Sequence, residues 1–288
     1  MKISVSSYSF QAKIQTGELN QFSCIRKAKE MGFEGIEFVE IQPHDGSPPE
    51  IYAQNLREEA KKQGLTITNF TVGADFLARG EQGVKDEIQR VKKLVDLAEI
   101  LGAVSMRHDA TAGLPKNSGK RYSGFEGALP VLADACRKVT EYASSKGIQT
   151  MVENHGFFCQ ESSVVERLAN AVNHENFGLL VDMGNFMCAD EDPVIAVGRT
   201  APYAFYAHAK DFHKKTGMDP DPGRGFFRTR GGNYLRGAII GHGIVPVQQC
   251  IHILKNAGYE GFIAIEFEGL EDCELGLEIG IENLKKMM

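Results

Sequence analysis

The 288-residue sequence lacks the features of several protein classes. Its six cysteines are scattered and form no C-x-x-C pair, so a zinc ribbon or a thioredoxin-type motif is not expected. No apolar run approaches the roughly 18 residues of a membrane span, and the N-terminus lacks the apolar core of a signal peptide. The net charge of −6 argues against a general nucleic-acid binder. We therefore expect a cytoplasmic protein with reduced thiols and with no membrane or nucleic-acid partner.

Short apolar runs alternate with helical patterns along the whole chain. The sequence predicts eight strands, at residues 3–10, 35–41, 66–72, 104–107, 149–153, 178–182, 204–210 and 259–267. Predicted helices follow them, at residues 19–31, 51–63, 84–101, 125–146, 163–172, 247–256 and 274–286, with a short one near Val194. Such alternation is typical of parallel strands joined by helical crossovers.

Eight strand–helix units indicate a closed barrel. We predict an α/β fold, a (β/α)8 TIM barrel, as a single domain over residues 1–288, since about 250 residues suffice for this fold. An open doubly wound sheet is the alternative, but no glycine-rich phosphate loop follows the first predicted strand.

Two connections, residues 109–124 and 213–243, are long and rich in glycine. Connections of this length without secondary structure usually carry function or move. We expect the second one to be a lid over the site or a contact with a neighbouring subunit of a homo-oligomer.

Four of the predicted strands end in ionisable residues: Glu153, Asp182 and His208 on three of them, and Glu266 with Glu268 on the last. Side chains at the carboxyl ends of barrel strands converge on one mouth. Each residue alone is more often a solvated or salt-bridged group, but the set on consecutive strands favours a metal site. Carboxylates suit Mn²⁺ or Mg²⁺, and the imidazole admits Co²⁺, Zn²⁺ or Fe²⁺. The spacing does not choose between Glu266 and Glu268, which share one face of the strand.

Further polar residues follow the same strand ends. We assign His108, His155 and Lys210 to substrate binding, and Arg107 is a further candidate. Each is also compatible with a role in orienting a metal ligand. Glu37, on the second predicted strand, is explained equally well by an ion pair inside the barrel.

The motifs around these residues resemble the xylose-isomerase-like barrel superfamily. They are residues 152–154 (V-E-N), 181–184 (V-D-M-G), 208–211 (H-A-K-D), 241–243 (G-H-G) and 261–266 (G-F-I-A-I-E). The likeness covers nearly the whole chain and is closest to the sugar isomerases and epimerases, a group with inosose dehydratases, hydroxypyruvate isomerases and ketose 3-epimerases. The motifs are more specific for the superfamily than for any substrate.

The resemblance implies metal ligands at Glu153, Asp182, His208 and Glu266, and so favours Glu266 over Glu268. It also implies that the two ligand glutamates act as acid and base, as they do in the ketose epimerases.

Two further positions follow from the resemblance. The arginine before the G-x-G element corresponds to Arg236, which would contact a substrate oxygen. Many members carry a histidine three residues after the ligand aspartate, where this chain has Asn185. We assign Asn185 to substrate binding, and the missing histidine argues against a three-metal site.

We therefore expect one divalent ion, with Mn²⁺ favoured over Zn²⁺, Co²⁺ or Mg²⁺, and a small-molecule carbohydrate substrate. The expected reaction is isomerisation or epimerisation of a sugar, a sugar phosphate or a polyol-derived ketone through an enediolate. An inosose-type dehydratase is an alternative on the same site. An endonuclease IV-like phosphodiesterase would need more metal ligands than the sequence offers. A sugar-binding barrel without turnover would have little use for two convergent bases.

Overall fold

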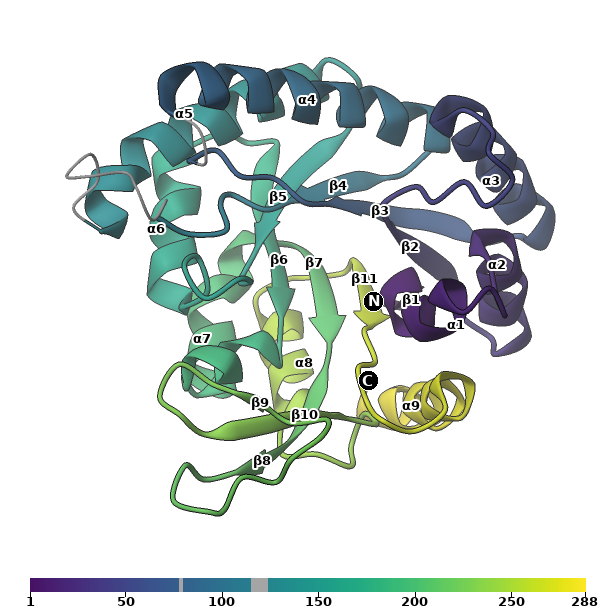
Figure 1. The fold of residues 1–288 in the computed structure, drawn as a ribbon, viewed down its shortest axis with the longest axis vertical. Coiled ribbons are helices and arrows are strands. Elements are labelled where there is room, and N and C mark those ends of the chain that lie inside the picture. Colours follow the sequence, from purple (N-terminus) through teal and green to yellow (C-terminus); the bar gives the residue numbers. More distant parts are fainter. Residues whose placement is uncertain (78–79, 115–123) are drawn as a thin grey trace.

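The structure, a computed structural model, describes residues 1–77, 80–114 and 124–288. Eight parallel strands close into a barrel in the order β1-β11-β7-β6-β5-β4-β3-β2. These strands are β1 (Lys2–Ser6), β2 (Gly35–Val39), β3 (Thr66–Val72), β4 (Ser105–His108), β5 (Gln149–Glu153), β6 (Phe177–Asp182), β7 (Ala204–Ala209) and β11 (Phe262–Ile265). The predicted (β/α)8 TIM barrel is confirmed (Figure 1).

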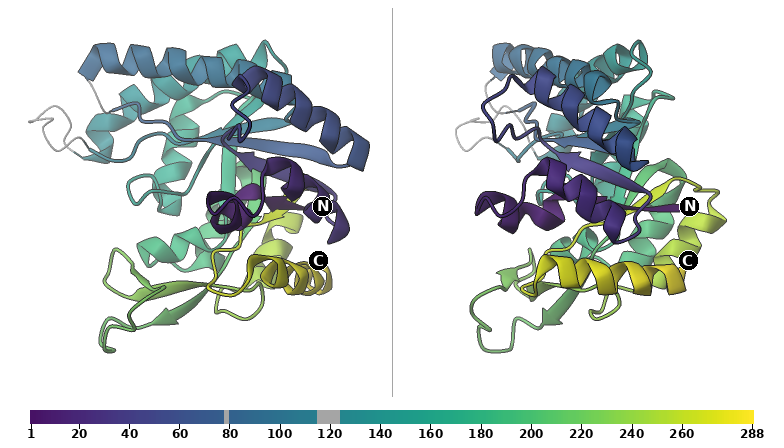
Figure 2. Two further views of the ribbon diagram at one scale, coloured as in Figure 1. Left: turned by 45° about the vertical axis from the view of Figure 1, so that its right-hand side comes forward. Right: turned by 90° about the vertical axis from the view of Figure 1, so that its right-hand side faces the viewer.

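Helices lie around the outside of the barrel (Figure 1; Figure 2). They are α1 (Gln11–Gln15), α2 (Gln21–Glu30), α3 (Pro49–Gln63), α4 (Gly80–Leu101), α5 (Phe125–Ser144), α6 (Ser162–Val172), α7 (Pro193–Thr200), α8 (Val247–Asn256) and α9 (Cys273–Met287). Each longer helix buries an apolar stripe against the strands, as Val91, Val95 and Ala98 do on α4. Within the described ranges, no helix combines the length and apolar character that crossing a membrane requires.

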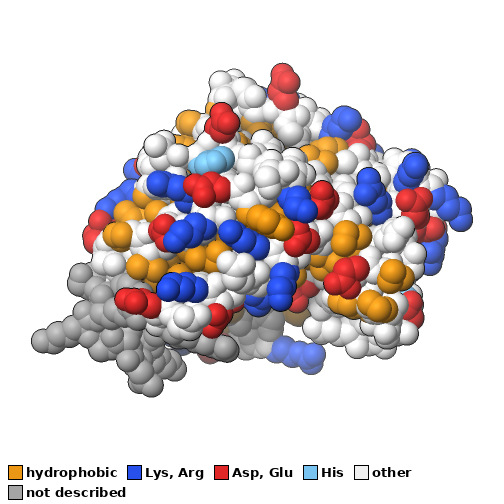
Figure 3. Space-filling view, turned by 90° about the horizontal axis from the view of Figure 1, so that it is seen from above, with side chains coloured by type: hydrophobic (Ala, Val, Ile, Leu, Met, Phe, Trp, Pro, Cys, Tyr) orange, Lys and Arg blue, Asp and Glu red, His pale blue; other side chains and the backbone are white. Residues whose placement is uncertain are grey.

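The surface over α4, seen from above in Figure 3, carries basic and acidic side chains side by side among apolar ones. This mixture on the visible part of that face is unlike the single-sign stripe of a nucleic-acid footprint. All six cysteines are buried and form no disulfide.

The first and last strands each differ from the sequence prediction by three or more residues at one end. The first predicted strand, residues 3–10, ends at Ser6, and Ser7–Phe10 form the 3-10 helix η1. The Ser6 hydroxyl accepts a hydrogen bond from the backbone N–H of Tyr8, which caps η1. The last predicted strand, residues 259–267, shortens to β11. Glu266 therefore lies just beyond the strand, at the barrel mouth.

The connection at residues 213–243 is not an irregular loop, and its predicted role as a lid or a subunit contact stays a prediction. It contains most of a small antiparallel sheet in the order β8-β10-β9, formed by β8 (Asp211–Lys215), β9 (Phe227–Arg228) and β10 (Tyr234–Ala238). The sheet projects away from the barrel, below β6 and β7 in the view of Figure 1. Of the other long connection, residues 115–123 lie outside the described part of the chain.

Asp211 fastens the base of this sheet. Its carboxylate accepts hydrogen bonds from the backbone N–H groups of Gly241 and Gly243, both at 2.9 Å, and of Val245 at 3.0 Å. A Cβ atom at Gly243 would overlap the Asp211 carboxylate, so this approach requires glycine. The H-A-K-D and G-H-G motifs are thus joined in one structural unit.

Candidate metal centre

The four predicted ligands converge at the carboxyl ends of neighbouring strands. Glu153 and Asp182 end β5 and β6, His208 is next to last in β7, and Glu266 follows β11. The barrel register pairs Asp182 with His208 and His208 with Ala264, which aligns these strand ends. Each residue offers one ligand atom, and the four atoms lie within 4.8 Å of one another. We refer to these four residues as the quartet.

The His208 Nδ1 atom lies among the three carboxylates of the quartet. It is 3.5 Å from Asp182 Oδ2, 3.6 Å from Glu266 Oε2 and 3.8 Å from Glu153 Oε1. Both His208 Nδ1 and Asp182 Oδ2 are buried and make no hydrogen bond among the described residues. A buried polar atom left without a partner costs about 1–3 kcal/mol. Lone pairs that converge in this way, from three carboxylates and an imidazole, fit a divalent cation.

Backbone contacts fix the orientation of Asp182. Its Oδ1 atom accepts the N–H groups of Gly184 at 2.8 Å and Asn185 at 2.7 Å, which leaves Oδ2 directed at the quartet. The side chain of Asn154 bonds both the N–H and the C=O of Asp182, each at 2.9 Å. The V-E-N and V-D-M-G motifs therefore hold β5 and β6 together at the quartet.

The second nitrogen of His208 contacts a buried carboxylate. Nε2 is 3.0 Å from Glu37 Oε2, and Glu37 also accepts hydrogen bonds from Ser6 Oγ at 2.9 Å and Asn69 Nδ2 at 3.2 Å. Glu37 is the interior group that the sequence left open between a site and an ion pair. A carboxylate on Nε2–H favours the tautomer whose Nδ1 lone pair faces the quartet.

The charge of His208 depends on the same contacts. Burial opposes its protonation, but the carboxylates of Glu37 and Glu266 outweigh burial and hold the pKa of His208 well above its usual value. Without a bound metal ion, the His208 ring is therefore protonated, and its extra proton lies within the quartet. Metal binding would displace that proton, because a histidine ligand must be neutral.

Glu153 lies between a cation and an amide. Arg107 Nη2 is 2.7 Å from Glu153 Oε2, and the same nitrogen is 2.8 Å from Asp109 Oδ1. Asn185 Nδ2 donates to Glu153 Oε1 at 2.9 Å. Burial raises the pKa of Glu153 above its usual value, even though Arg107 acts to lower it. The Glu153 carboxylate is therefore well positioned and unusually basic.

Glu266 has the opposite electrostatic surroundings. Lys210 Nζ is 2.5 Å from Glu266 Oε2 and 3.4 Å from Glu268 Oε1. Burial acts against ionisation, but Lys210 and then His208 hold the pKa of Glu266 well below its usual value. Glu268 lies outside the quartet, and burial raises its pKa. The pKa values of Glu153 and Glu266 are thus shifted in opposite directions, which is typical of an acid–base pair.

Three of the predicted substrate contacts meet beside the quartet. Asn185, Lys210 and His155 line one cavity of about 180 Å³. Lys210 Nζ donates to Asn185 Oδ1 at 3.2 Å, and the half-exposed His155 ring lies 3.2 Å from Asp109 Oδ1.

The structure does not bring His108 to the quartet, which corrects its predicted placement. Consecutive strand residues face opposite sides, and Arg107 occupies the side of the mouth. The His108 ring instead packs against Phe76 and Phe177, with centroids 5.7 and 6.5 Å away. Burial there lowers the pKa of His108 to about 4.

Arg236 lies on β10, apart from the quartet residues. Its Nη2 atom is 3.5 Å from Glu271 Oε1, and its guanidinium lies 5.8 Å from the centre of the Phe226 ring. The predicted contact of Arg236 with substrate would therefore lie beside Glu271 and not at the quartet. The sequence analysis did not identify Glu271, because no motif distinguishes it from other acidic residues of the loop.

The chain matches the xylose isomerase-like TIM barrel family over residues 25–287. Inosose dehydratase 1 of Bacillus cereus is 24% identical over 140 residues, which cover 48% of this chain and 46% of that protein. The match thus spans about half the length of that relative. Inosose dehydratase of Geobacillus thermodenitrificans is 20% identical over 258 residues, which cover 88% of this chain and 83% of that protein.

Solved structures share the fold. The IOLI protein with a zinc atom has a TM-score of 0.74 at 16% identity, covering 100% of this chain and 98% of that one. A xylose isomerase-like TIM barrel protein from Mycobacterium smegmatis in complex with magnesium has 0.71 at 16%, covering 99% and 96%. L-ribulose 3-epimerase has 0.73 at 15%, covering 99% and 94%. At these identities the likeness concerns the barrel itself.

Proposed function

The chain belongs to the xylose isomerase-like TIM barrel family, and on that premise we propose that it is a divalent-metal-dependent isomerase or epimerase of a sugar or a polyol-derived ketone. One observation carries the proposal. His208 Nδ1 and Asp182 Oδ2 are buried between two further carboxylates and have no hydrogen-bond partner among the described residues, and Lys210 Nζ lies 3.5 Å from Asp182 Oδ2.

The quartet would hold one ion. Its three carboxylates favour Mn²⁺ or Mg²⁺, and its imidazole also admits Zn²⁺ or Co²⁺. The names of two structural neighbours, which mention zinc and magnesium, are compatible with this range. When bound, such an ion supplies Lewis acidity to a substrate carbonyl and its neighbouring hydroxyl.

Glu153 is the better candidate for removing the carbon-bound proton. Burial makes its carboxylate more basic, while Arg107 and Asn185 fix its two oxygens. The Glu266 carboxylate, held ionised by Lys210, is the candidate for the opposite face of the substrate. The Lys210 ammonium lines the adjoining cavity and can donate a hydrogen bond to a substrate oxygen. Proton return to another carbon gives an isomer, and return to the other face gives an epimer.

Dehydration is the second candidate. The two relatives compared above are both named inosose dehydratases. Glu268, whose pKa is raised by burial and which lies 3.4 Å from Lys210, could protonate a leaving hydroxyl. The phosphodiesterase alternative has less support, because only the quartet satisfies the geometry of a metal site among the described side chains.

Turnover in D₂O tests the proposal and separates its two forms. The Mn²⁺-loaded protein should be incubated with a panel of ketoses, inososes and their phosphates and followed by NMR. Isomerisation or epimerisation gives a new sugar with deuterium at the reacting carbon, whereas dehydration gives an unsaturated or deoxygenated ketone. Absence of any exchange across the panel, with metal fully bound, would contradict an enzymatic role in proton transfer.

A further inference from the structure

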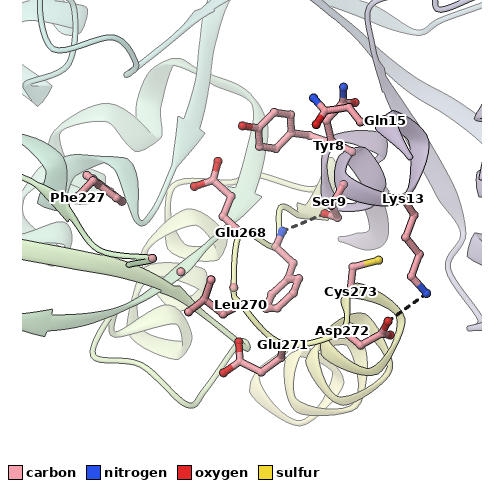
Figure 4. A pocket seen from close by; sticks show the side chains of 16 residues that line it. Tyr8, Ser9, Lys13, Gln15, Phe227, Glu268, Leu270, Glu271, Asp272 and Cys273 are labelled. Carbon is pink, nitrogen blue, oxygen red and sulfur yellow. Dashed lines mark hydrogen bonds and ion pairs between the residues drawn. The ribbon is translucent and has the colours of Figure 1, made fainter. Parts of the chain in front are cut away.

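A second, larger cavity opens next to the quartet. It has a volume of about 660 Å³ and lies between η1 and α1 on one side and β10 and the β11–α9 connection on the other (Figure 4). We call it the groove; its lining includes Tyr8, Gln15, Phe227, Glu268, Leu270 and Glu271. Phe227 and Glu268 also line the cavity of about 180 Å³ beside the quartet, so the two spaces adjoin.

The two volumes imply a substrate of two parts. Sites for drug-sized ligands measure roughly 300–1,000 Å³. The inner cavity, at about 180 Å³, falls below that range, while the groove, at about 660 Å³, lies within it. The inner cavity borders the quartet through Asn185, which contacts Glu153, and Lys210, which contacts Glu266, so a ligand unit that occupies it leaves the groove free for a second unit of similar or larger size.

The charges of the groove disfavour an anion, although Lys210 and Arg236 lie behind two of its carboxylates, 3.4 Å from Glu268 and 3.5 Å from Glu271. Its described lining carries Glu268, Glu271 and Asp272, and its one cation is Lys13. The Lys13 ammonium is already engaged, because it lies 3.0 Å from Asp272 and 2.7 Å from Glu274. A phosphate would meet excess negative charge there. Hydroxyl groups, by contrast, can donate to these carboxylates.

The two carboxylate oxygens of Glu271 have different surroundings. Glu271 Oε1 is 3.5 Å from Arg236, but Oε2 is buried and has no hydrogen-bond partner among the described residues. In Figure 4 the Glu271 and Glu268 side chains extend from the same connection. Because Glu271 Oε2 is closed to solvent, neutral donors from a ligand would reach Glu268 and the Oε1 side of Glu271, and they would add no charge.

Apolar groups stand beside these acceptors. The Tyr8 ring is 41% exposed and the Leu270 side chain 58% exposed. An aromatic ring with a polar tip suits the C–H face and the hydroxyl rim of a sugar. The wall behind them is closely packed, since a Cβ atom at Gly237 of β10 would overlap the Glu268 carbonyl oxygen.

We propose that the groove binds a second, uncharged sugar unit, so that the substrate is a keto-glycoside or keto-disaccharide and not a sugar phosphate. This rests on the proposed function, because it places the carbonyl-bearing unit at the quartet. The second unit lays its apolar face on Tyr8 or Leu270 and donates hydroxyl hydrogen bonds to Glu271 and Glu268.

Calorimetry with the Mn²⁺-loaded full chain tests this, with glucose, maltose, cellobiose and glucose 6-phosphate as probes. At least one disaccharide should bind about tenfold or more tightly than glucose, a difference of about 1.4 kcal/mol. Glucose 6-phosphate should bind no more tightly than glucose. Equal affinity for glucose and both disaccharides, no disaccharide binding, or preference for the phosphate would overturn the assignment.

A matched pair of variants locates the effect. Leu270→Arg places a long cation in the groove and should abolish the disaccharide advantage while metal content and glucose affinity stay unchanged. Leu275→Arg alters a similarly exposed leucine on α9, outside the groove lining, and should behave as wild type. Loss of the advantage in both variants would refute the groove as its source. A protein that binds no metal refutes the proposed function instead, so the two failures are distinguishable.

Discussion

The quartet and the groove are adjacent but are built differently. The quartet residues come from the ends of four barrel strands, and their side chains are 0–11% exposed. The groove is lined by η1, α1, β10 and the connection after β11, with large side chains open to solvent. Strand ends fix atoms tightly enough to hold an ion, whereas connections can vary the ligand that is accepted. Under the proposed function, the quartet would carry the chemistry and the groove the selectivity.

Charge separates the two regions as well. Around the quartet, Arg107 faces Glu153 and Lys210 faces Glu266, so every glutamate ligand has its own cation. In the groove, Glu268 lies 3.4 Å from Lys210 and Glu271 lies 3.5 Å from Arg236, but the only cation among the described lining residues is Lys13. A divalent ion suits the first region, and neutral hydroxyl groups suit the second.

The largest effect is expected from His208→Ala. It removes the nitrogen around which the three carboxylates gather, so bound metal and turnover should both be lost. The barrel should remain folded, because the residue lies at the mouth. Metal analysis and circular dichroism measure the two outcomes. His252→Ala, an exposed histidine on α8, is the control and should keep its metal. Full metal retention in His208→Ala would place the ion elsewhere.

Glu153→Gln should be nearly as damaging to turnover and far milder for the metal. The amide keeps an oxygen for the ion but no longer takes up a proton, and acid–base participation is worth about 10²- to 10⁴-fold in rate. Glu266→Gln should show a loss of the same order. The measurement is exchange of the substrate's carbon-bound hydrogen in D₂O. Near wild-type exchange in both variants would mean that the glutamates only bind metal, and His155 or Lys210 would become the candidate base.

Glu37→Gln should weaken metal binding without touching the quartet. Loss of a carboxylate that holds a ligand histidine typically costs about 10–100-fold in metal affinity. Chelator competition measures that affinity, and ¹⁵N NMR of the His208 ring reports its tautomer. Glu30→Gln, on an exposed side chain of α2, is the control. Unchanged affinity and an unchanged tautomer would show that Glu37 merely fills the barrel.

The smallest effect is expected from Arg236→Ala. Its guanidinium lies beside Glu271 in the groove wall and has no contact with the quartet among the described residues. Substrate affinity should fall severalfold while metal affinity stays the same. Isothermal titration of each ligand separates the two. A parallel loss of metal would show that the groove and the quartet are not independent.

Sequence could predict where the quartet lies because its geometry follows from the barrel, but the choice of Glu266 over Glu268 came from the family resemblance. Once β5, β6, β7 and β11 are parallel neighbours, their carboxyl ends must meet. The placement of His108 was wrong because the sequence does not show which face of β4 carries Arg107. The β8-β10-β9 sheet was missed because its strands are short and are separated by glycine-containing segments, and because Asp211 stabilises its base through contacts distant in sequence.

The groove was beyond sequence reasoning for a similar reason. Tyr8, Phe227 and Leu270 come from three distant segments and carry no shared motif. Their proximity depends on η1 turning out of β1 and on β10 packing against the Glu268 carbonyl. Neither event has a local signal in the chain.

Metal stoichiometry is the most direct test of the central claim, that these four strand ends form one metal centre. The protein should be purified without chelator, loaded with Mn²⁺ and analysed by inductively coupled plasma mass spectrometry, with His208→Ala alongside. The account predicts close to one equivalent per wild-type chain and close to none in the variant. Three equivalents of zinc, or no bound metal in the wild-type protein under saturating conditions, would contradict it.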